Sequence, residues 1–357
     1  MVTIVDLFGH EQLRERLSAS IRAGKLPSSL LLQGPRGVGK QRLAIWIAQS
    51  LLCREADPPC GECVSCRYAA DLTHPDLHWI FPRPRLKDSD PDLSQVRDDY
   101  ADAIAERAAE HGLYPSPSGT EGIYVATVRY LVQQAVIAPA IGRRKVFIIG
   151  DAERMVPQEG ADMAANAFLK LLEEPPADTT IILTSSEPGA LLPTIRSRVV
   201  TVRVPLLHDK DVRAFVENTV VKRTLDKNGK ATASERVRAA AGAPGTLLTG
   251  EADAKATLNA RRIVDAAVSA RPSTIHATAL AQGSFGARGS FADTLDALVA
   301  LLGERARDAL HRNDSSAAAA ASKAVDAVLQ AQTWTETNVS PQLIASKLIR
   351  ELATTLK

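Results

Sequence analysis

The sequence has 357 residues, a length that corresponds to about two or three domains. Its 43 basic and 41 acidic residues give a net charge of +2, which excludes a strong overall field toward nucleic acid or a membrane. Any DNA contact therefore has to come from a local patch. The amino-terminal segment has no basic region followed by an apolar run, and no stretch reaches about 18 uninterrupted apolar residues. We expect a globular protein of the cytoplasm.

Four short apolar runs rich in β-branched residues are separated by longer, helix-like segments. The runs span residues 30–33, 145–149, 180–184 and 199–204. Continuous rather than alternating apolarity is typical of strands that are covered on both faces. The runs therefore predict a parallel sheet in an α/β domain.

A phosphate-binding loop pattern, G-x-x-x-x-G-K, follows the first run. It reads GPRGVGK from Gly34 to Lys40, and an apolar stripe at helical spacing comes after it. Its glycines permit backbone N–H groups to surround phosphate oxygens at a helix N-terminus, and Lys40 would reach the β- and γ-phosphates. The alternative is a glycine-rich turn that never binds nucleotide. Gln41 stands where a Ser or Thr normally holds magnesium.

The four cysteines of the chain have the spacing C-x6-C-x2-C-x2-C. They are Cys53, Cys60, Cys63 and Cys66. Four thiolates match a closed structural zinc site, and such clustering in a reducing compartment favours a metal over disulfides. An iron–sulfur cluster and free structural thiols are the alternatives. Because the cysteines complete a ligand set, we interpret His74 and His78 as loop residues.

The composition changes between residues 68 and 122. This segment is rich in Pro and Asp, contains a helix-like stretch at 96–111 and ends in turn-forming residues. We interpret it as a surface insertion carried by the sheet domain.

Asp151 follows the run at 145–149, where P-loop ATPases place the acidic residue that holds magnesium or its water. Many such ATPases have a Glu directly after this Asp to activate the attacking water, but here the next residue is Ala152. Glu153 comes one position later, and a shift of one residue after a strand points a side chain elsewhere. The departures at Gln41 and Ala152 together predict weak or absent ATP hydrolysis.

The stretch PTIRSRVV places Arg196 and Arg198 just before the last apolar run. An exposed arginine there would project into the nucleotide site of a neighbouring subunit and stabilise transition-state charge. A solvated basic loop is the alternative.

Strand signals nearly vanish after residue 205. Short helices are expected at 209–217 and 234–241, around the charged turn DKNGK, and the remainder from about residue 254 is Ala-rich and helical. We expect three domains, at residues 1–205, 206–253 and 254–357.

Five stretches taken together resemble the clamp-loader branch of the AAA+ ATPases. They are GPRGVGK, the four-cysteine module, VRYLVQQAVIAPAIGRRKVFIIGDAERM, AANAFLKLLEEPPADTTIILTSSEP and LLPTIRSR. The resemblance is dense over residues 1–205 apart from the segment 68–122. It is thin afterwards, although NVSPQLIASKLIREL looks like the family's closing helix.

The resemblance implies a RecA-like ATPase domain, a small helical lid and an all-helical carboxy-terminal collar that joins subunits into a hetero-pentamer. By position in the family's S-R step, Arg198 is the arginine finger, although Val199 replaces the usual Cys. Thr184 or Ser185 looks like the sensor of the γ-phosphate. The expected nucleotide contacts are Gly34, Pro35, Gly37, Val38, Gly39, Lys40, Gln41, Asp151 and Thr184.

Within this branch, the residues are more similar to a stator-like subunit than to the motor ATPase subunit. The motor would have Thr after Lys40 and Asp-Glu at 151–152, whereas this chain has Gln41 and Ala152. A stator would bind nucleotide without turnover, assemble with the other loader subunits, and act through the complex on the sliding clamp and primer–template DNA. The motor is the alternative. A zinc-dependent nucleic-acid adaptor is a weaker one, since only Arg54 and Arg67 flank the cysteines.

Overall fold

The computed structural model describes residues 3–88, 90–117, 121–155, 162–227, 229–248, 251–283, 288–335 and 339–356. Residues 89 and 118–120 of the expected insertion lie outside this described part. The chain divides into two compact units, of which the first comprises Met1–Ser116 with Glu121–Leu248 and the second is built on Thr249–Lys357. The division into three domains stays a prediction.

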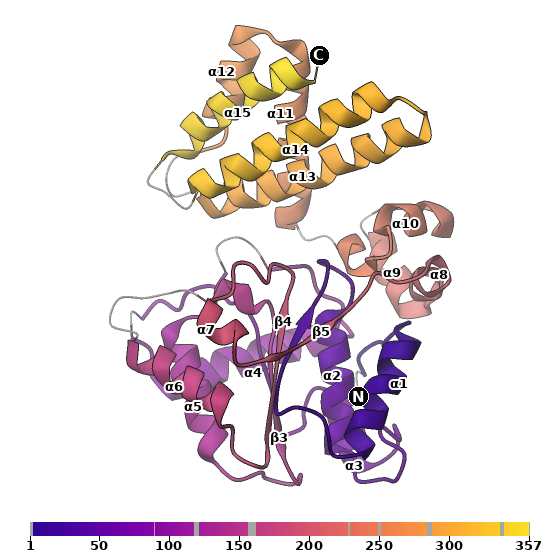
Figure 1. Ribbon diagram of the computed structural model, residues 1–357, viewed down its shortest axis with the longest axis vertical. Helices are drawn as coiled ribbons and strands as arrows, with labels where there is room; N and C mark the ends of the chain where they lie inside the picture. The colour runs from indigo at the N-terminus through magenta and orange to yellow at the C-terminus, as the bar shows by residue number, and fades with distance from the viewer. Residues whose placement is uncertain are drawn as a thin grey trace. The chain divides into compact units, whose positions relative to one another are not determined.

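The first unit is built on a parallel sheet, which in the described residues has five strands in the order β2-β3-β4-β1-β5 (Figure 1). The strands are β1 (Ser29–Gln33), β2 (Leu77–Ile80), β3 (Lys145–Ile149), β4 (Thr179–Ser185) and β5 (Val200–Arg203). The four predicted runs became β1, β3, β4 and β5. This confirms the parallel α/β prediction, and the loop that joins β1 to the next helix completes the RecA-like arrangement.

Strand β2 is a correction to the expected surface insertion. It lies inside the segment 68–122 and pairs with β3, with Leu77 opposite Val146. Trp79 and Ile80 are buried in the core, so the beginning of this segment belongs to the sheet itself. His78 was interpreted as a loop residue, which is wrong, because it lies in β2. His74 does lie in the loop before β2, where it is buried.

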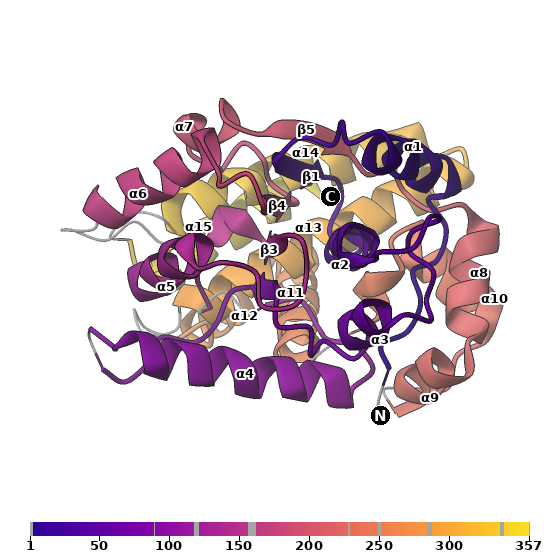
Figure 2. The same cartoon turned by 90° about the horizontal axis from the view of Figure 1, so that it is seen from below.

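Helices cover both faces of the sheet, with α2 on one side and α5 and α6 on the other (Figure 2). Those of the sheet region are α1 (Glu11–Arg22), α2 (Lys40–Leu52), α3 (Val64–Ala70), α4 (Leu93–Ala109), α5 (Val125–Val136), α6 (Asp162–Glu173) and α7 (Pro193–Arg196), with a short η1 turn (Ala152–Arg154). Helix α4 is the expected helix of the segment 68–122, and it begins with a capping box of Asp92 and Gln95.

A second, smaller core lies in the same unit. It forms between α8 (Asp209–Glu217), α9 (Thr219–Lys227), α10 (Ala233–Ala240) and η2 (Pro244–Leu247). Helices α8 and α10 match the expected ones, whereas α9 was not predicted. Leu113, from the end of the segment 68–122, also packs into this core.

The second unit is helical in its described residues. It contains α11 (Glu251–Ser269), α12 (Pro272–Leu280), α13 (Arg288–His311), α14 (Ser315–Thr335) and α15 (Pro341–Thr355). These helices enclose a core of their own, to which Leu298 of α13, Val328 of α14 and Leu348 of α15 contribute. None of the helices that the structure describes combines the length and apolarity needed to cross a lipid bilayer.

Candidate nucleotide site and metal centre

The phosphate-loop pattern forms the turn between β1 and α2. Gly37 and Gly39 adopt left-handed conformations, with φ of 77° and 94°, which only glycine adopts without strain. Gly39 is the N-cap of α2, so the loop leads straight into a helix N-terminus. Val38 is buried, and its carbonyl oxygen lies 3.0 Å from Nε2 of His10. This backbone shape is the one that lets N–H groups converge on an anion.

Lys40 is buried over the loop. Its Nζ donates to the carbonyl oxygens of Gly34 and Pro35 at 2.9 and 2.8 Å, and to Oγ of Ser186 at 2.8 Å. Burial lowers the pKa of Lys40, while Asp151 and Glu153 favour its charged form. The ammonium group is thus held at the loop, where a phosphate would have to compete with these three acceptors.

Asp151 and Thr184 are brought together at the ends of β3 and β4. The backbone N–H of Asp151 donates to Oγ1 of Thr184 at 3.1 Å, and Thr184 is fully buried. Burial, followed by the charge of Glu153, raises the pKa of Asp151. Ala152 is buried and has no group that can activate water.

Gln41 lies against Asp151, with its Nε2 donating to Oδ2 of Asp151 at 2.9 Å. Its Oε1 accepts from Nε1 of Trp79 at 3.0 Å and from the hydroxyl of Tyr114 at 3.2 Å. The guanidinium of Arg107 stacks over the Tyr114 ring, 3.8 Å from its centroid. Sequence reasoning missed Trp79, Arg107 and Tyr114, which all come from the segment 68–122.

The region after α10 also touches the loop. The backbone N–H of Gly245 in η2 donates to the carbonyl oxygen of Gly37 at 2.8 Å. A Cβ atom on Gly245 would lie 2.9 Å from Cα and O of Gly37, so the two backbones meet where neither residue has a side chain.

Arg198 lies between α7 and β5, outside the phosphate loop. Its Nη2 is 2.5 Å from Oε1 of Glu173, and its Nη1 donates to the carbonyl oxygen of Thr194 at 2.8 Å. Neither partner belongs to the phosphate loop. Arg196, two residues earlier, is exposed.

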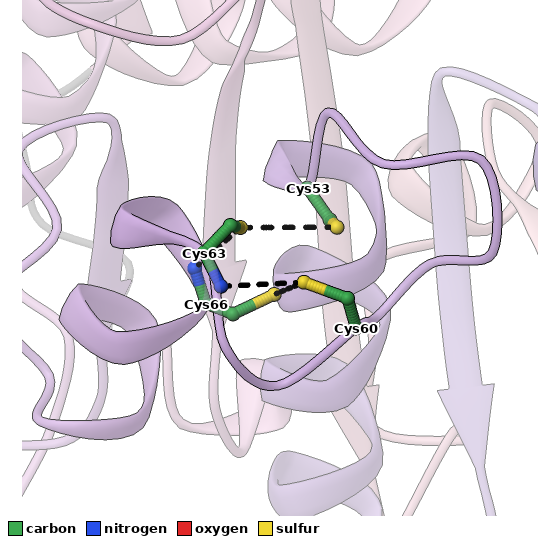
Figure 3. Close-up of side chains that lie close together, drawn as sticks. All are labelled: Cys53, Cys60, Cys63 and Cys66. Carbon is green, nitrogen blue, oxygen red and sulfur yellow. Dashed lines mark hydrogen bonds between the residues drawn. The ribbon is translucent and has the colours of Figure 1, made fainter.

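The four cysteine sulfurs face one another between the end of α2 and the start of α3 (Figure 3). All four lie within 4.8 Å of one another, and the pairs Cys53–Cys63 and Cys60–Cys66 are each 3.9 Å apart. The backbone N–H groups of Cys63 and Cys66 donate to the sulfurs of Cys60 and Cys63. Burial raises the pKa of Cys66, whereas the backbone N–H groups of Cys63 and Glu62 lower the pKa of Cys60 to about 7. The cluster can therefore hold a metal ion.

Comparison with known proteins places this chain in a family. The family model described as "DNA polymerase III, delta subunit" matches residues 9–208. The chain belongs to this family. The matched range contains the phosphate loop, the cysteine cluster and Arg198.

Relatives within and beside the family each match about half of the chain or somewhat more. DNA polymerase III subunit delta' of Pseudomonas aeruginosa is 38% identical over 178 residues, which are 49% of this chain and 42% of that protein. The subunit delta' of Escherichia coli is 30% identical over 186 residues, 52% of this chain and 44% of that protein. DNA polymerase III subunit gamma/tau of Mycobacterium bovis is 31% identical over 216 residues, 60% of this chain and 30% of that protein. The chain thus spans less than half of the length of these relatives.

The solved structure of a DNA polymerase III gamma subunit-related protein from Thermotoga maritima is 16% identical, with a TM-score of 0.45. The alignment covers 96% of this chain and 99% of that one.

Proposed function

We propose that the chain is a delta'-type subunit of a DNA polymerase III clamp loader. It would assemble with gamma/tau and delta subunits in a hetero-pentamer and help to load the sliding clamp on primed DNA, in the bacterial cytoplasm. The family match and the delta' relatives support this proposal. We further propose the predicted division into an ATPase-like domain, a lid and a collar as its organisation.

The main support for a stator-like subunit, as opposed to a motor ATPase subunit, is the set of residues that follows Asp151. A motor subunit needs a carboxylate next to Asp151 that is free to orient water, and the residue there is the buried Ala152. Glu153 comes one position later, where its Oε1 accepts the backbone N–H of Ser186 at 2.9 Å and its Oε2 is buried without a hydrogen-bond partner among the described residues. The chain would therefore bind nucleotide through Lys40 and the loop without turning it over.

Zinc is the metal that we propose for the cysteine cluster. Four thiolates at a Zn–S distance of about 2.3 Å lie about 3.8 Å apart in a tetrahedron. The two sulfur pairs measured at 3.9 Å fit that arrangement. Cys53, Cys60, Cys63 and Cys66 would be its ligands, and a closed set of four leaves no position for catalysis.

Arg198 is the residue that we propose to act on a neighbouring ATPase subunit. An arginine finger contributes about 10³–10⁵ to kcat at the site that it serves. In a loader reconstituted with its partner subunits, clamp and primed DNA, Arg198→Ala is expected to remove the turnover of one site. The ATPase rate of the complex measures this loss, and size-exclusion chromatography shows that assembly is intact.

Arg196→Ala is the matched control, because this exposed arginine lies only two residues earlier and is expected to leave the rate unchanged. An unchanged rate in Arg198→Ala with full assembly would refute the finger assignment. The isolated chain, with Lys40→Ala beside it, tests the motor alternative, which the gamma/tau relatives keep open. A motor predicts magnesium-dependent turnover by the isolated chain that Lys40→Ala abolishes.

A further inference from the structure

The amide of Gln41 is held in one orientation by three hydrogen bonds. An indole N–H can only donate, so the Gln41 atom that faces Trp79 at 3.0 Å has to be the oxygen. The Tyr114 hydroxyl donates to the same oxygen at 3.2 Å. The amide nitrogen therefore faces Asp151, with Nε2 2.9 Å from Oδ2.

The backbone directly after β3 has room for this amide because the residue there, Gly150, has no side chain. Gly150 follows β3 and precedes Asp151. A Cβ atom built on Gly150 would lie only 2.4 Å from Oε1 and 2.7 Å from Nε2 of Gln41. The Gln41 amide thus occupies the space beside the strand end, where a P-loop ATPase keeps its metal between the loop hydroxyl and the acidic residue.

A buried positive charge packs against Trp79 and Tyr114 as well. The Arg107 guanidinium is 3.2 Å from the ring centroid of Phe81, 3.8 Å from that of Tyr114 and 4.6 Å from that of Trp79. Burial lowers the pKa of Arg107 to about 10, which keeps the group charged at neutral pH, and Asp151 is among the negative groups that favour this charge. Its Nη1 is buried without a hydrogen-bond partner among the described residues.

Magnesium does not fit this arrangement. It requires oxygen ligands at about 2.0–2.1 Å in an octahedron, whereas the group next to Asp151 presents N–H hydrogens. To admit the metal, Gln41 would have to rotate away, which would leave the buried indole of Trp79 and hydroxyl of Tyr114 without their acceptor.

We propose that this phosphate-loop site has no coordination position for a divalent cation, because the Gln41 amide takes the metal's place at Asp151. The segment 68–122 thereby acquires a role, since it contributes the Trp79 and Tyr114 side chains that hold Gln41 against Asp151. The exclusion of a divalent cation follows from the hydrogen bonds of Gln41 with Asp151, Trp79 and Tyr114. Its corollary, that any nucleotide bound here needs no magnesium, rests on the proposed function.

The test is a titration of the full-length, zinc-loaded chain with Mn²⁺, followed by electron paramagnetic resonance of the free ion. No nucleotide or partner subunit is present, so the result is independent of the loader assays described above. The wild-type chain is expected to show no saturable Mn²⁺ site that depends on Asp151. Gln41→Thr, which restores a hydroxyl and frees the carboxylate, is expected to gain one.

Two variants make the assignment specific. Asp151→Asn in the Gln41→Thr background is expected to abolish the new site, and Gln12→Thr, at an exposed glutamine of α1, controls for binding to the general surface. Should Gln41→Thr fail to fold by circular dichroism, Gln41→Ser serves in its place. Mn²⁺ binding by the wild-type chain that Asp151→Asn removes would overturn the proposal. So would the absence of a gained site in a folded Gln41 variant, because Gln41 would then not be what excludes the metal.

Discussion

His78 is a half-buried histidine whose protonation is coupled to folding. Its ring stacks on Phe147 of β3 with the centroids 4.6 Å apart. Burial, and then the charge of Lys145, lower its pKa from 6.5 to about 4. Because the unfolded chain binds this proton at a higher pH than the folded chain, the stability that His78 contributes is present above about pH 6.5. It is lost as the pH falls toward 4, with about 2 kcal/mol gone at pH 5.

Urea unfolding of the wild-type chain and of His78→Leu, each at pH 7 and pH 5, measures this contribution. Leucine cannot titrate, so the variant keeps the pH dependence of every other group and lacks that of His78. The wild-type chain is expected to lose about 2 kcal/mol more free energy of unfolding than the variant. Equal losses in both proteins would mean that this ring does not carry the linkage.

Single residues could be predicted from the sequence where a local motif holds them. The phosphate loop is one continuous stretch, and Asp151 follows a recognisable buried run. Trp79 and Tyr114 could not be predicted as partners of Gln41, because the packing of β2 and of the chain after α4 brings them there. Their only signal is compositional, since a chain with 4% aromatic residues places both in a segment otherwise rich in Pro and Asp.

The contact between η2 and the phosphate loop makes Gly245 a sensitive position. Gly245→Ala would place a methyl group 2.9 Å from Cα and O of Gly37, a distance that forces the two backbones apart. Overpacking of this kind costs about 1–3 kcal/mol. The hydrogen bond from Gly245 N–H to Gly37 O, now 2.8 Å long, would weaken as well. The midpoint of urea denaturation of the first unit is the measurement.

Gly189→Ala is the matched control for this variant. A Cβ atom on Gly189 meets nothing within 4 Å, and its φ lies outside the left-handed region. The same glycine-to-alanine change is therefore expected to be neutral or slightly stabilising there. If Gly245→Ala were as stable as Gly189→Ala, the described contact between η2 and the loop would not contribute to stability.

Strands were predictable where they read as apolar runs, which includes the mostly exposed edge strand β5. Strands β1, β3 and β4 lie inside the sheet and read as continuous apolar runs. Strand β2 is an edge strand whose one partner in the described residues is β3, and its first two residues are half-buried. Its short sequence, LHWI, therefore lacks the signal of a covered strand. Helix α9 was missed because its charged carboxy-terminal end was interpreted as part of a turn.

At the scale of the whole molecule, the two units have separate hydrophobic cores. The cores of the first unit gather around the sheet and around α8–α10, and that of the second lies among α11–α15. The cysteine cluster belongs to the first unit alone, where Nε2 of Gln49 in α2 donates to the carbonyl oxygen of Cys66. A chain built in this way is expected to unfold in more than one step.

Metal removal is expected to act on one of these steps. Zinc bound only by the folded cluster stabilises by about 4 kcal/mol when its free concentration is about 1,000 times Kd. For a unit of this size, losing that energy lowers Tm by about 10 °C. Calorimetry of the full chain should therefore show two transitions, of which a zinc chelator lowers one. Added zinc should restore it, and Cys63→Ser should already have the lowered value and not respond to chelator. A shift of both transitions, or of neither, would contradict a metal that stabilises the first unit alone.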